Sequence, residues 1–191
     1  MIIWGNVLKA IEHYRKRGYT YVEVPWIVSQ EAIQVTIPSG KEPLVCQYGS
    51  LVGSAEQSFI QLMMTGECPT GKFMAATPCF RDDEVDLLHQ KTFFKVELIE
   101  VRNSGLDGSA MWTEEALGHM VKDALDCYHS LINGANAYIA ATTQGIDIKL
   151  KGIELGSYGI RRHENWVWVY GTGYADPRYN TACLASIPGL L

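Results

Sequence analysis

Residues that could bind a nucleotide are concentrated between Phe80 and Glu97, where an arginine and a phenylalanine flank a charged loop. Arg81 stands at the end of one apolar run, and Phe93 begins the next. A guanidinium group donates two parallel hydrogen bonds at fixed charge, which suits a phosphate, and an aromatic ring can lie flat on a purine. The segment therefore predicts a hairpin that holds a nucleotide triphosphate, with phosphate at one end and base at the other.

The order of residues in this segment resembles motif 2 of the class II aminoacyl-tRNA synthetases. The resemblance is carried by Phe80-Arg81-Asp82-Asp83, His89, Phe93 and Glu97, and the run after His89 is most similar to the seryl branch. Asp83 stands where that family carries a glutamate, and Lys91-Thr92 are two additional residues before the phenylalanine. The loop also lacks the arginine that the family uses for the outer phosphate, which leaves His89 or Lys91 in that place.

Three more segments resemble motifs of the same family and follow in the same order. Residues 18–27 resemble motif 1, which forms a strand at the family's dimer interface. Residues 51–56 resemble the loop that holds the substrate's amino group in the seryl, threonyl and prolyl enzymes. Residues 171–178 resemble motif 3, a strand-to-helix turn whose arginine meets the γ-phosphate. The matches cover residues 4 to 187, and the resemblance implies a homodimer that pairs through residues 4 to 30.

The resemblance implies roles in ATP binding for several side chains. Arg81 would hold the α-phosphate, Arg178 the γ-phosphate, and Phe93 would stack on the adenine. By the same resemblance, Asp83 and His89 would be further ATP contacts. Activation of an amino acid needs no protein nucleophile or general base, because the substrate's own carboxylate attacks the α-phosphorus in line. A site built of arginines and acids agrees with this reaction.

Acidic residues are the candidates for binding Mg²⁺ and the amino acid. Glu154 stands where the family carries a metal-binding acid before motif 3, and Mg²⁺ prefers oxygen ligands. Glu97 is the second metal candidate. Glu56 and Glu97 would face the substrate's ammonium group, because acids offset its charge inside a cleft. Ser54 and Lys95 complete the amino-acid site, and the resemblance favours serine or another small amino acid.

Composition favours one globular domain spanning residues 1–191. Of the 191 residues, 47% are hydrophobic and 19% are charged, which is enough for a sizeable core. We expect neither a membrane span nor a secretory signal. The 5 cysteines are scattered without a Cys-x-x-Cys pair, which favours reduced thiols and a cytoplasmic protein.

The formal net charge of −5 bears on the acceptor of the activated amino acid. Proteins that grip a nucleic-acid backbone generally carry a basic patch, and only residues 9–17 come close to one. Cations in such a place are typical of a helix C-terminus. We expect no appended tRNA-binding domain, so tRNA and other acceptors both stay open. A second basic cluster, Arg161-Arg162-His163, is interpreted as solvated.

Apolar periodicity predicts the elements that must position these residues. Helical spacing runs over residues 3–14, where Gly18 stops the helix, and over 110–132. Strands are expected at 21–28, 48–52, 73–76, 93–102, 138–142, 146–155 and 166–170, with shorter helices at 57–65 and 181–186 and a loop at 36–50. Trp166, Trp168 and Tyr170 would form one packed sheet face. Helices segregated from antiparallel hairpins indicate an α+β fold, and the resemblance implies the class II synthetase antiparallel sheet flanked by helices.

Three functions follow from these residues. The first is ATP-dependent amino acid activation, in which an aminoacyl-adenylate forms and its acyl group passes to tRNA or another acceptor. The second is a non-catalytic synthetase-like paralogue that binds amino acid and ATP for regulation, which Asp83 and the missing loop arginine favour. The third is a carboxylate-activating amide ligase of the same fold.

Overall fold

The computed structural model describes residues 2–68, 70–103, 110–131, 136–143 and 145–185. Within them, the main sheet has seven strands in the order β1-β5-β6-β10-β9-β8-β7. The strands are β1 (Thr20–Tyr21), β5 (Gly71–Phe80), β6 (Thr92–Asn103), β7 (Tyr138–Thr142), β8 (Gly145–Leu150), β9 (Ile153–His163) and β10 (Trp166–Asp176). β1 pairs in parallel with β5, and the other neighbours are antiparallel.

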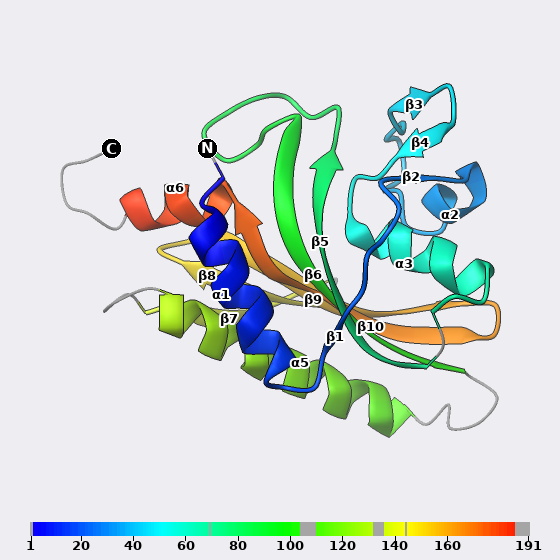
Figure 1. Cartoon of the computed structure of the whole chain (residues 1–191). Helices are drawn as coiled ribbons and strands as arrows, with labels where there is room; N and C mark the ends of the chain where they lie inside the picture. Colours follow the sequence, from blue (N-terminus) through cyan, green and yellow to red (C-terminus); the bar gives the residue numbers. More distant parts are fainter. Residues whose placement is uncertain (1, 69, 104–109, 132–135, 144, 186–191) are drawn as a thin grey trace.

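A smaller sheet and the helices surround the main sheet (Figure 1). The small sheet has the order β2-β4-β3 and consists of β2 (Ile27–Val28), β3 (Val45–Cys46) and β4 (Gly49–Leu51). The helices are α1 (Trp4–Arg15), α2 (Gln30–Gln34), α3 (Ala55–Met64), α5 (Ala110–Leu131) and α6 (Arg178–Leu184). α1 and α5 lie against one face of the main sheet, and α2, α3 and the small sheet lie over the other face. This segregated arrangement confirms the predicted α+β class.

Strand β6 shows how the period of two in a strand divides the molecule into layers. Phe94, Val96 and Leu98 belong to the core that contains α1 and α5. On the opposite face, Phe93, Lys95 and Glu97 line a cleft. Farther along, Ile99 and Val101 belong to the core beneath α3. The same sheet face therefore carries the polar cleft at one end and an apolar core at the other.

The two long predicted helices are present. Gly18 follows α1 with a φ of 86°, a left-handed conformation that glycine adopts without strain. In the buried face of α1, Tyr14 donates a hydrogen bond to the Gly173 carbonyl at 2.8 Å. Helix α5 has 22 residues, and its predicted apolar face, which includes Met120 and Ala124, is buried.

Several predicted element boundaries are wrong. Residues 21–28 form parts of β1 and β2, which belong to different sheets, instead of one strand. Residues 146–155 contain a turn at Lys151 and Gly152, with φ angles of 50° and 84°, which separates β8 from β9. The expected loop at 36–50 contains β3 and the start of β4, helix α2 was not predicted, and the last helix begins at Arg178, earlier than predicted.

The predicted packing of Trp166, Trp168 and Tyr170 on one face of β10 is confirmed, because all three belong to or pack against the core beneath α3. None of the helices in the described parts of the chain has both the length and the apolar character needed to cross a membrane.

Candidate active site

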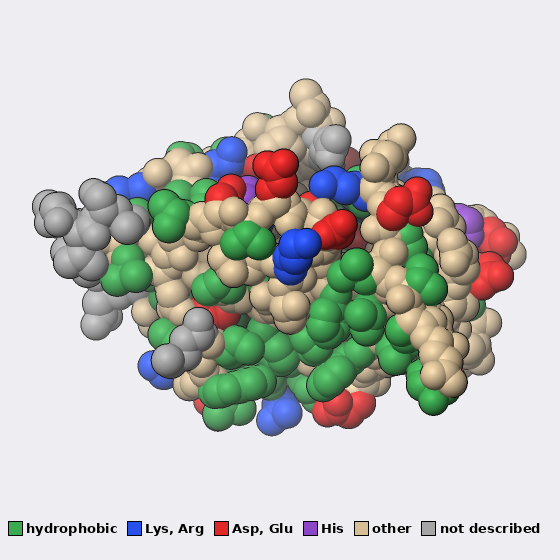
Figure 2. Space-filling model, turned by 90° about the horizontal axis from the view of Figure 1, so that it is seen from above, with side chains coloured by type: hydrophobic (Ala, Val, Ile, Leu, Met, Phe, Trp, Pro, Cys, Tyr) green, Lys and Arg blue, Asp and Glu red, His purple; other side chains and the backbone are tan. Residues whose placement is uncertain are grey.

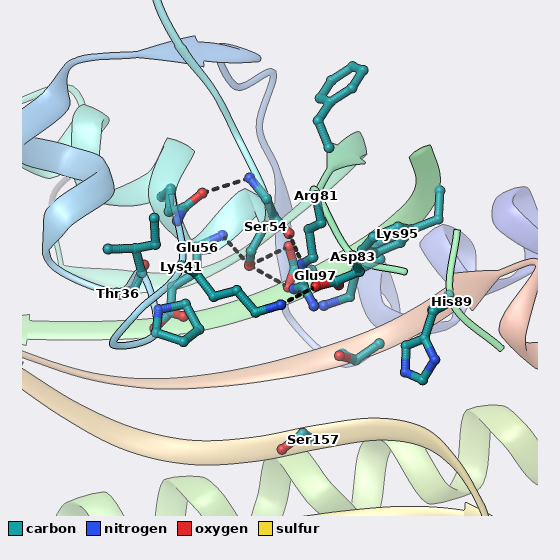
Figure 3. Close-up of a pocket in the computed structure, with 18 of the residues that line it drawn as sticks. Thr36, Lys41, Ser54, Glu56, Arg81, Asp83, His89, Lys95, Glu97 and Ser157 are labelled. Carbon is teal, nitrogen blue, oxygen red and sulfur yellow. Dashed lines mark hydrogen bonds and ion pairs between the residues drawn. The ribbon is translucent and has the colours of Figure 1, made fainter. Parts of the chain in front are cut away.

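A cleft of about 740 Å³ opens on the face of the main sheet that carries α3. Its lining comes from the segment after α2, the start of α3, the β5–β6 hairpin, β9, β10 and the start of α6. Ten of the side chains singled out from the sequence line this cleft: Ser54, Glu56, Arg81, Asp83, His89, Phe93, Lys95, Glu97, Glu154 and Arg178. Lys91 is not among the lining residues. Figure 3 labels seven of the ten, from Ser54 to Glu97 without Phe93. Segments that are distant in the sequence therefore meet at one place.

The hairpin places Arg81 beside Phe93, as the spacing predicts. Cys79 pairs with Phe93 in the β5–β6 ladder, and β5 ends at Phe80. Arg81 is therefore two residues beyond the partner of Phe93. Arg81 Nε donates to the Gly53 carbonyl at 2.9 Å, and its guanidinium carbon lies 5.1 Å from the centroid of the Phe93 ring. In the described structure no carboxylate forms an ion pair with Arg81, so the terminal amino groups of its fork stay available to an anion.

Glu97 joins strand β6 to the N-terminus of α3. Its carboxylate accepts hydrogen bonds from Ser54 Oγ at 2.8 and 2.9 Å and from the Ala55 backbone N–H, and it pairs with Lys95 Nζ at 2.5 Å. Burial alone would raise the pKa of Glu97, but the Lys95 ammonium and these donors outweigh burial and lower it. Glu97 is therefore an ionised and well-satisfied carboxylate.

Glu56 also lines the cleft, from the first turn of α3. Its carboxylate accepts a hydrogen bond from Trp168 Nε1 at 2.7 Å and lies 3.5 Å from Arg161 Nε. Burial raises the pKa of Glu56, although Arg161 and Trp168 oppose the shift. The interpretation of Arg161 as a solvated residue is wrong, because it lines the cleft with a side chain only 35% exposed. Its neighbour Arg162 is exposed, as expected.

The other end of the cleft holds Arg178, whose Nη1 donates to Glu154 at 2.8 Å. A β-bulge in β9 aims Glu154 toward it. Lys149 pairs with Glu154 whereas Ile148 pairs with Gly156, so Leu155 is an additional residue. Leu155 is buried in the core on the helical face, and the bulge lets Glu154 share the cleft face with Ser157.

The charged loop of the hairpin is held by ion pairs. Lys41, from the segment after α2, meets Asp83 at 2.8 Å, and this hydrogen bond lowers the pKa of Asp83. His89 pairs with Asp86, also at 2.8 Å. Lys91 is likewise 2.8 Å from Asp82. The two loop side chains that could replace the missing arginine, His89 and Lys91, are thus paired inside the loop.

Several lining residues were not predicted from the sequence. They are Thr36, Lys41, Ser157, Arg161, Tyr170, Thr172 and Asp176. A signal existed for Arg161, because residues 157, 159 and 161 alternate onto one face of a strand. No local signal marks Lys41, since its position depends on how the segment after α2 folds over the hairpin.

The described residues contain no group of three or more histidine, cysteine or acidic side chains that could hold a metal ion. The Glu154 side chain is 40% exposed and, among the described residues, pairs with Arg178 alone, so it keeps lone pairs for a cation shared with a ligand. Glu97 fits a metal less well, because its two oxygens already accept from Ser54, Ala55 and Lys95. Mg²⁺ is commonly bound by one or two carboxylates together with substrate phosphates, which agrees with the donor set at Glu154.

No family model matches the sequence, and no curated protein matches it. Solved structures do match. The pyrrolysyl tRNA synthetase PylSc of Desulfitobacterium hafniense has a TM-score of 0.68 and 17% identity, over 93% of this chain and 67% of that chain. The seryl-tRNA synthetase of Pyrococcus horikoshii, complexed with ATP, has a TM-score of 0.72 and 15% identity, over 93% of this chain and 49% of that chain.

The cytoplasmic serine-tRNA ligase of Naegleria fowleri, in complex with AMP, has a TM-score of 0.71 and 16% identity, over 96% of this chain and 49% of that chain. The present chain thus spans about half the length of both seryl enzymes. Because the sequence identities to these structures are 15–17%, the similarity establishes the fold alone. The chain has the fold of the catalytic core of class II aminoacyl-tRNA synthetases.

Proposed function

We propose that this chain binds ATP and an amino acid in the cleft and joins them as an aminoacyl-adenylate, whose acyl group then passes to tRNA or another acceptor. One observation carries the proposal. Arg81 and Arg178, which belong to motif-like segments far apart in the sequence, line the same cleft together with Phe93. Two arginines and an aromatic ring in one cleft are suited to a triphosphate and its base.

The proposed reaction needs positioning more than it needs acid–base chemistry. An oxygen of the amino acid's carboxylate forms a bond to the α-phosphorus, and the bond from that phosphorus to the bridging oxygen of the β-phosphate breaks, which releases pyrophosphate. Arg81 would contact the α-phosphate where charge develops, and Arg178 would contact the γ-phosphate. Phe93 would stack on the adenine, with Asp83 and His89 at the border of the nucleotide site.

Glu154 would hold Mg²⁺ together with ATP, and the ion would supply positive charge to the phosphates when bound. Glu154 also fixes the guanidinium of Arg178 through their 2.8 Å contact. The amino acid would lie at the other end of the cleft, among Ser54, Glu56, Lys95 and Glu97. Among these, Glu56 is the better partner for the substrate's ammonium, because Lys95 already neutralises Glu97.

The test is exchange of labelled pyrophosphate into ATP with each amino acid in turn. Exchange that depends on one amino acid is the expected result. A different observation favours the regulatory paralogue, since His89 and Lys91 are paired with Asp86 and Asp82 and leave the outer phosphate with fewer cations. ATP binding by calorimetry without exchange for any amino acid would support that alternative and reject catalysis.

We also propose that the chain forms a homodimer through residues 4–30. Large hydrophobic side chains of this region are exposed, among them Trp4 at 57%, Leu8 at 60% and Trp26 at 53%. Figure 2 shows hydrophobic side chains gathered on one face of the molecule. Trp4 and Leu8 are four residues apart in α1 and so share one helix face, and an exposed apolar face can mark an interaction surface. In sedimentation at micromolar concentration we expect a dimer that Leu8→Lys converts to a monomer and that Ile139→Lys, on β7, leaves intact.

A further inference from the structure

The guanidinium of Arg161 lies in the cleft with much of its hydrogen-bonding capacity unused. Its Nε is 3.5 Å from Glu56 Oε1, and its Nη1 is 3.5 Å from the Thr36 carbonyl. Both contacts are longer than the 2.7–2.9 Å or so that is usual for charge-assisted hydrogen bonds. The pair of Arg178 with Glu154 measures 2.8 Å, and that of Lys95 with Glu97 measures 2.5 Å. Of these three cleft cations, Arg161 is the one held most loosely.

Tyr170 fixes the direction of this arginine. The guanidinium carbon of Arg161 lies 4.7 Å from the centroid of the Tyr170 ring. In the ladder between β9 and β10, Tyr170 pairs with Gly159, and a Cβ atom at position 159 would lie 2.7 Å from the tyrosine hydroxyl. The absence of a side chain at Gly159 therefore leaves room for the Tyr170 ring over β9, where the ring contacts the guanidinium of Arg161. The cation is oriented before any ligand arrives.

Thr36 supplies a second unsatisfied group at the same end of the cleft. Its hydroxyl oxygen is buried and has no hydrogen-bond partner, although the residue lines the cleft beside Arg161. A buried polar group without a partner is costly, and a ligand atom that accepts its hydrogen bond removes the cost. A carboxylate offers two acceptor oxygens, which match one donor from Thr36 and a fork of donors from Arg161.

We infer that Arg161 and Thr36 bind the side-chain carboxylate of an acidic amino acid, so that aspartate or glutamate is the substrate of this site. The inference rests on the proposed function, because it assigns the amino acid that is activated. Glu56 would bind the ammonium group of the substrate. Glu56 and Arg161 lie 3.5 Å apart, and the ammonium and side-chain carboxylate of an acidic amino acid are also close together, because only a few bonds separate them. A serine hydroxyl would offer one neutral acceptor atom in place of two charged ones, so it could not satisfy Thr36 and pair with the charge of Arg161 together.

Binding is tested by calorimetric titration of the full chain with L-aspartate, L-asparagine, L-glutamate, L-glutamine, L-serine and O-phospho-L-serine, followed by pyrophosphate exchange with each. We expect one acidic amino acid to bind at least tenfold more tightly than its own amide. Arg161→Gln should abolish that preference, and Thr36→Val should weaken it severalfold. The matched control is Arg162→Gln, which changes the adjacent, exposed arginine and should keep the preference. Thermal melting of each variant checks that it is folded.

The ratio of the affinities for an acid and for its amide shows whether Arg161 recognises the carboxylate or only supports the fold, because structural damage would weaken the binding of both ligands alike. Tighter binding of serine, of an amide or of phosphoserine than of either acid would overturn the inference, as would an unchanged ratio in Arg161→Gln. Binding of an acid through Arg161 without any exchange would uphold the inference and reject the proposed catalysis. Exchange with a neutral amino acid alone would uphold catalysis and reject the inference. Absence of both binding and exchange would overturn both.

Discussion

Replacing Arg81 by alanine should remove catalysis while leaving the protein folded. In the folded protein the substitution deletes one hydrogen bond, from Nε to the Gly53 carbonyl, and the contact of the guanidinium with the Phe93 ring. The hydrogen bond contributes about 1 kcal/mol and the cation–π contact about 0.5–1 kcal/mol. The summed loss of about 2 kcal/mol lowers the melting temperature of a domain of this size by roughly 4–8 °C.

The loss of activity should be much larger. If Arg81 contacts the α-phosphate as charge develops there, its removal should lower kcat for pyrophosphate exchange by about 10²–10³-fold, the effect typical of one donor at an oxyanion. Arg81→Lys should restore little, because lysine keeps the charge but lacks the planar fork and the anchor to Gly53. The assay is exchange at saturating ATP and amino acid, with Arg162→Ala as the control.

The result that refutes this reasoning is a kcat within tenfold of the unmodified protein in an Arg81→Ala variant that melts at the expected temperature. Such an outcome would mean that the guanidinium is a structural link between the hairpin and the Gly53 loop and does not take part in the reaction.

Three further outcomes are expected. Phe93→Ala should raise KM for ATP more than it lowers kcat in steady-state kinetics, because stacking on the base is present before and during the reaction. Glu97→Gln should cost about 3–5 kcal/mol in urea unfolding by leaving Lys95 buried and unpaired, and addition of Lys95→Met should recover part of it. The folded-state pKa of Glu97 is lowered, so its contribution to stability is complete above its ordinary pKa and is lost as the pH falls through the folded-state pKa. The free energy of unfolding should therefore fall less steeply with decreasing pH in Glu97→Gln than in the unmodified protein. Gly171→Ala would place a Cβ atom 2.2 Å from Cδ1 of Tyr158, so it should destabilise the protein by about 1–3 kcal/mol in the same assay.

Those cleft residues could be predicted from the sequence whose proposed role in binding requires one particular type of side chain. An arginine for phosphate and an aromatic ring for a base cannot be exchanged freely, so Arg81 and Phe93 could be recognised from the hairpin that carries them. The alternation of β6 also separates Phe93 from Phe94 once the strand is known, and Phe94 is indeed buried in the core.

What the sequence did not reveal depends on contacts between distant segments. The direction of Glu154 depends on the bulge at Leu155, which exists only in the pairing of β9 with β8. Arg161 lies in a run of cations that is typical of surface, and its position in the cleft follows from the partners Glu56 and Tyr170. The turn at residues 151 and 152 was missed because apolar residues continue on both sides of it.

The hydrogen bond from the Ala55 backbone N–H to Glu97 makes that amide a built-in reporter of the cleft. Its hydrogen exchanges with deuterium only when this hydrogen bond opens. The amides of Leu88 and His89, which donate to the exposed Asp86, lie in the lining of the proposed nucleotide site and provide a second reporter there. Hydrogen–deuterium exchange at these two sites, followed by mass spectrometry, would therefore register a ligand at either end of the cleft in the unsubstituted protein, whether or not any turnover follows.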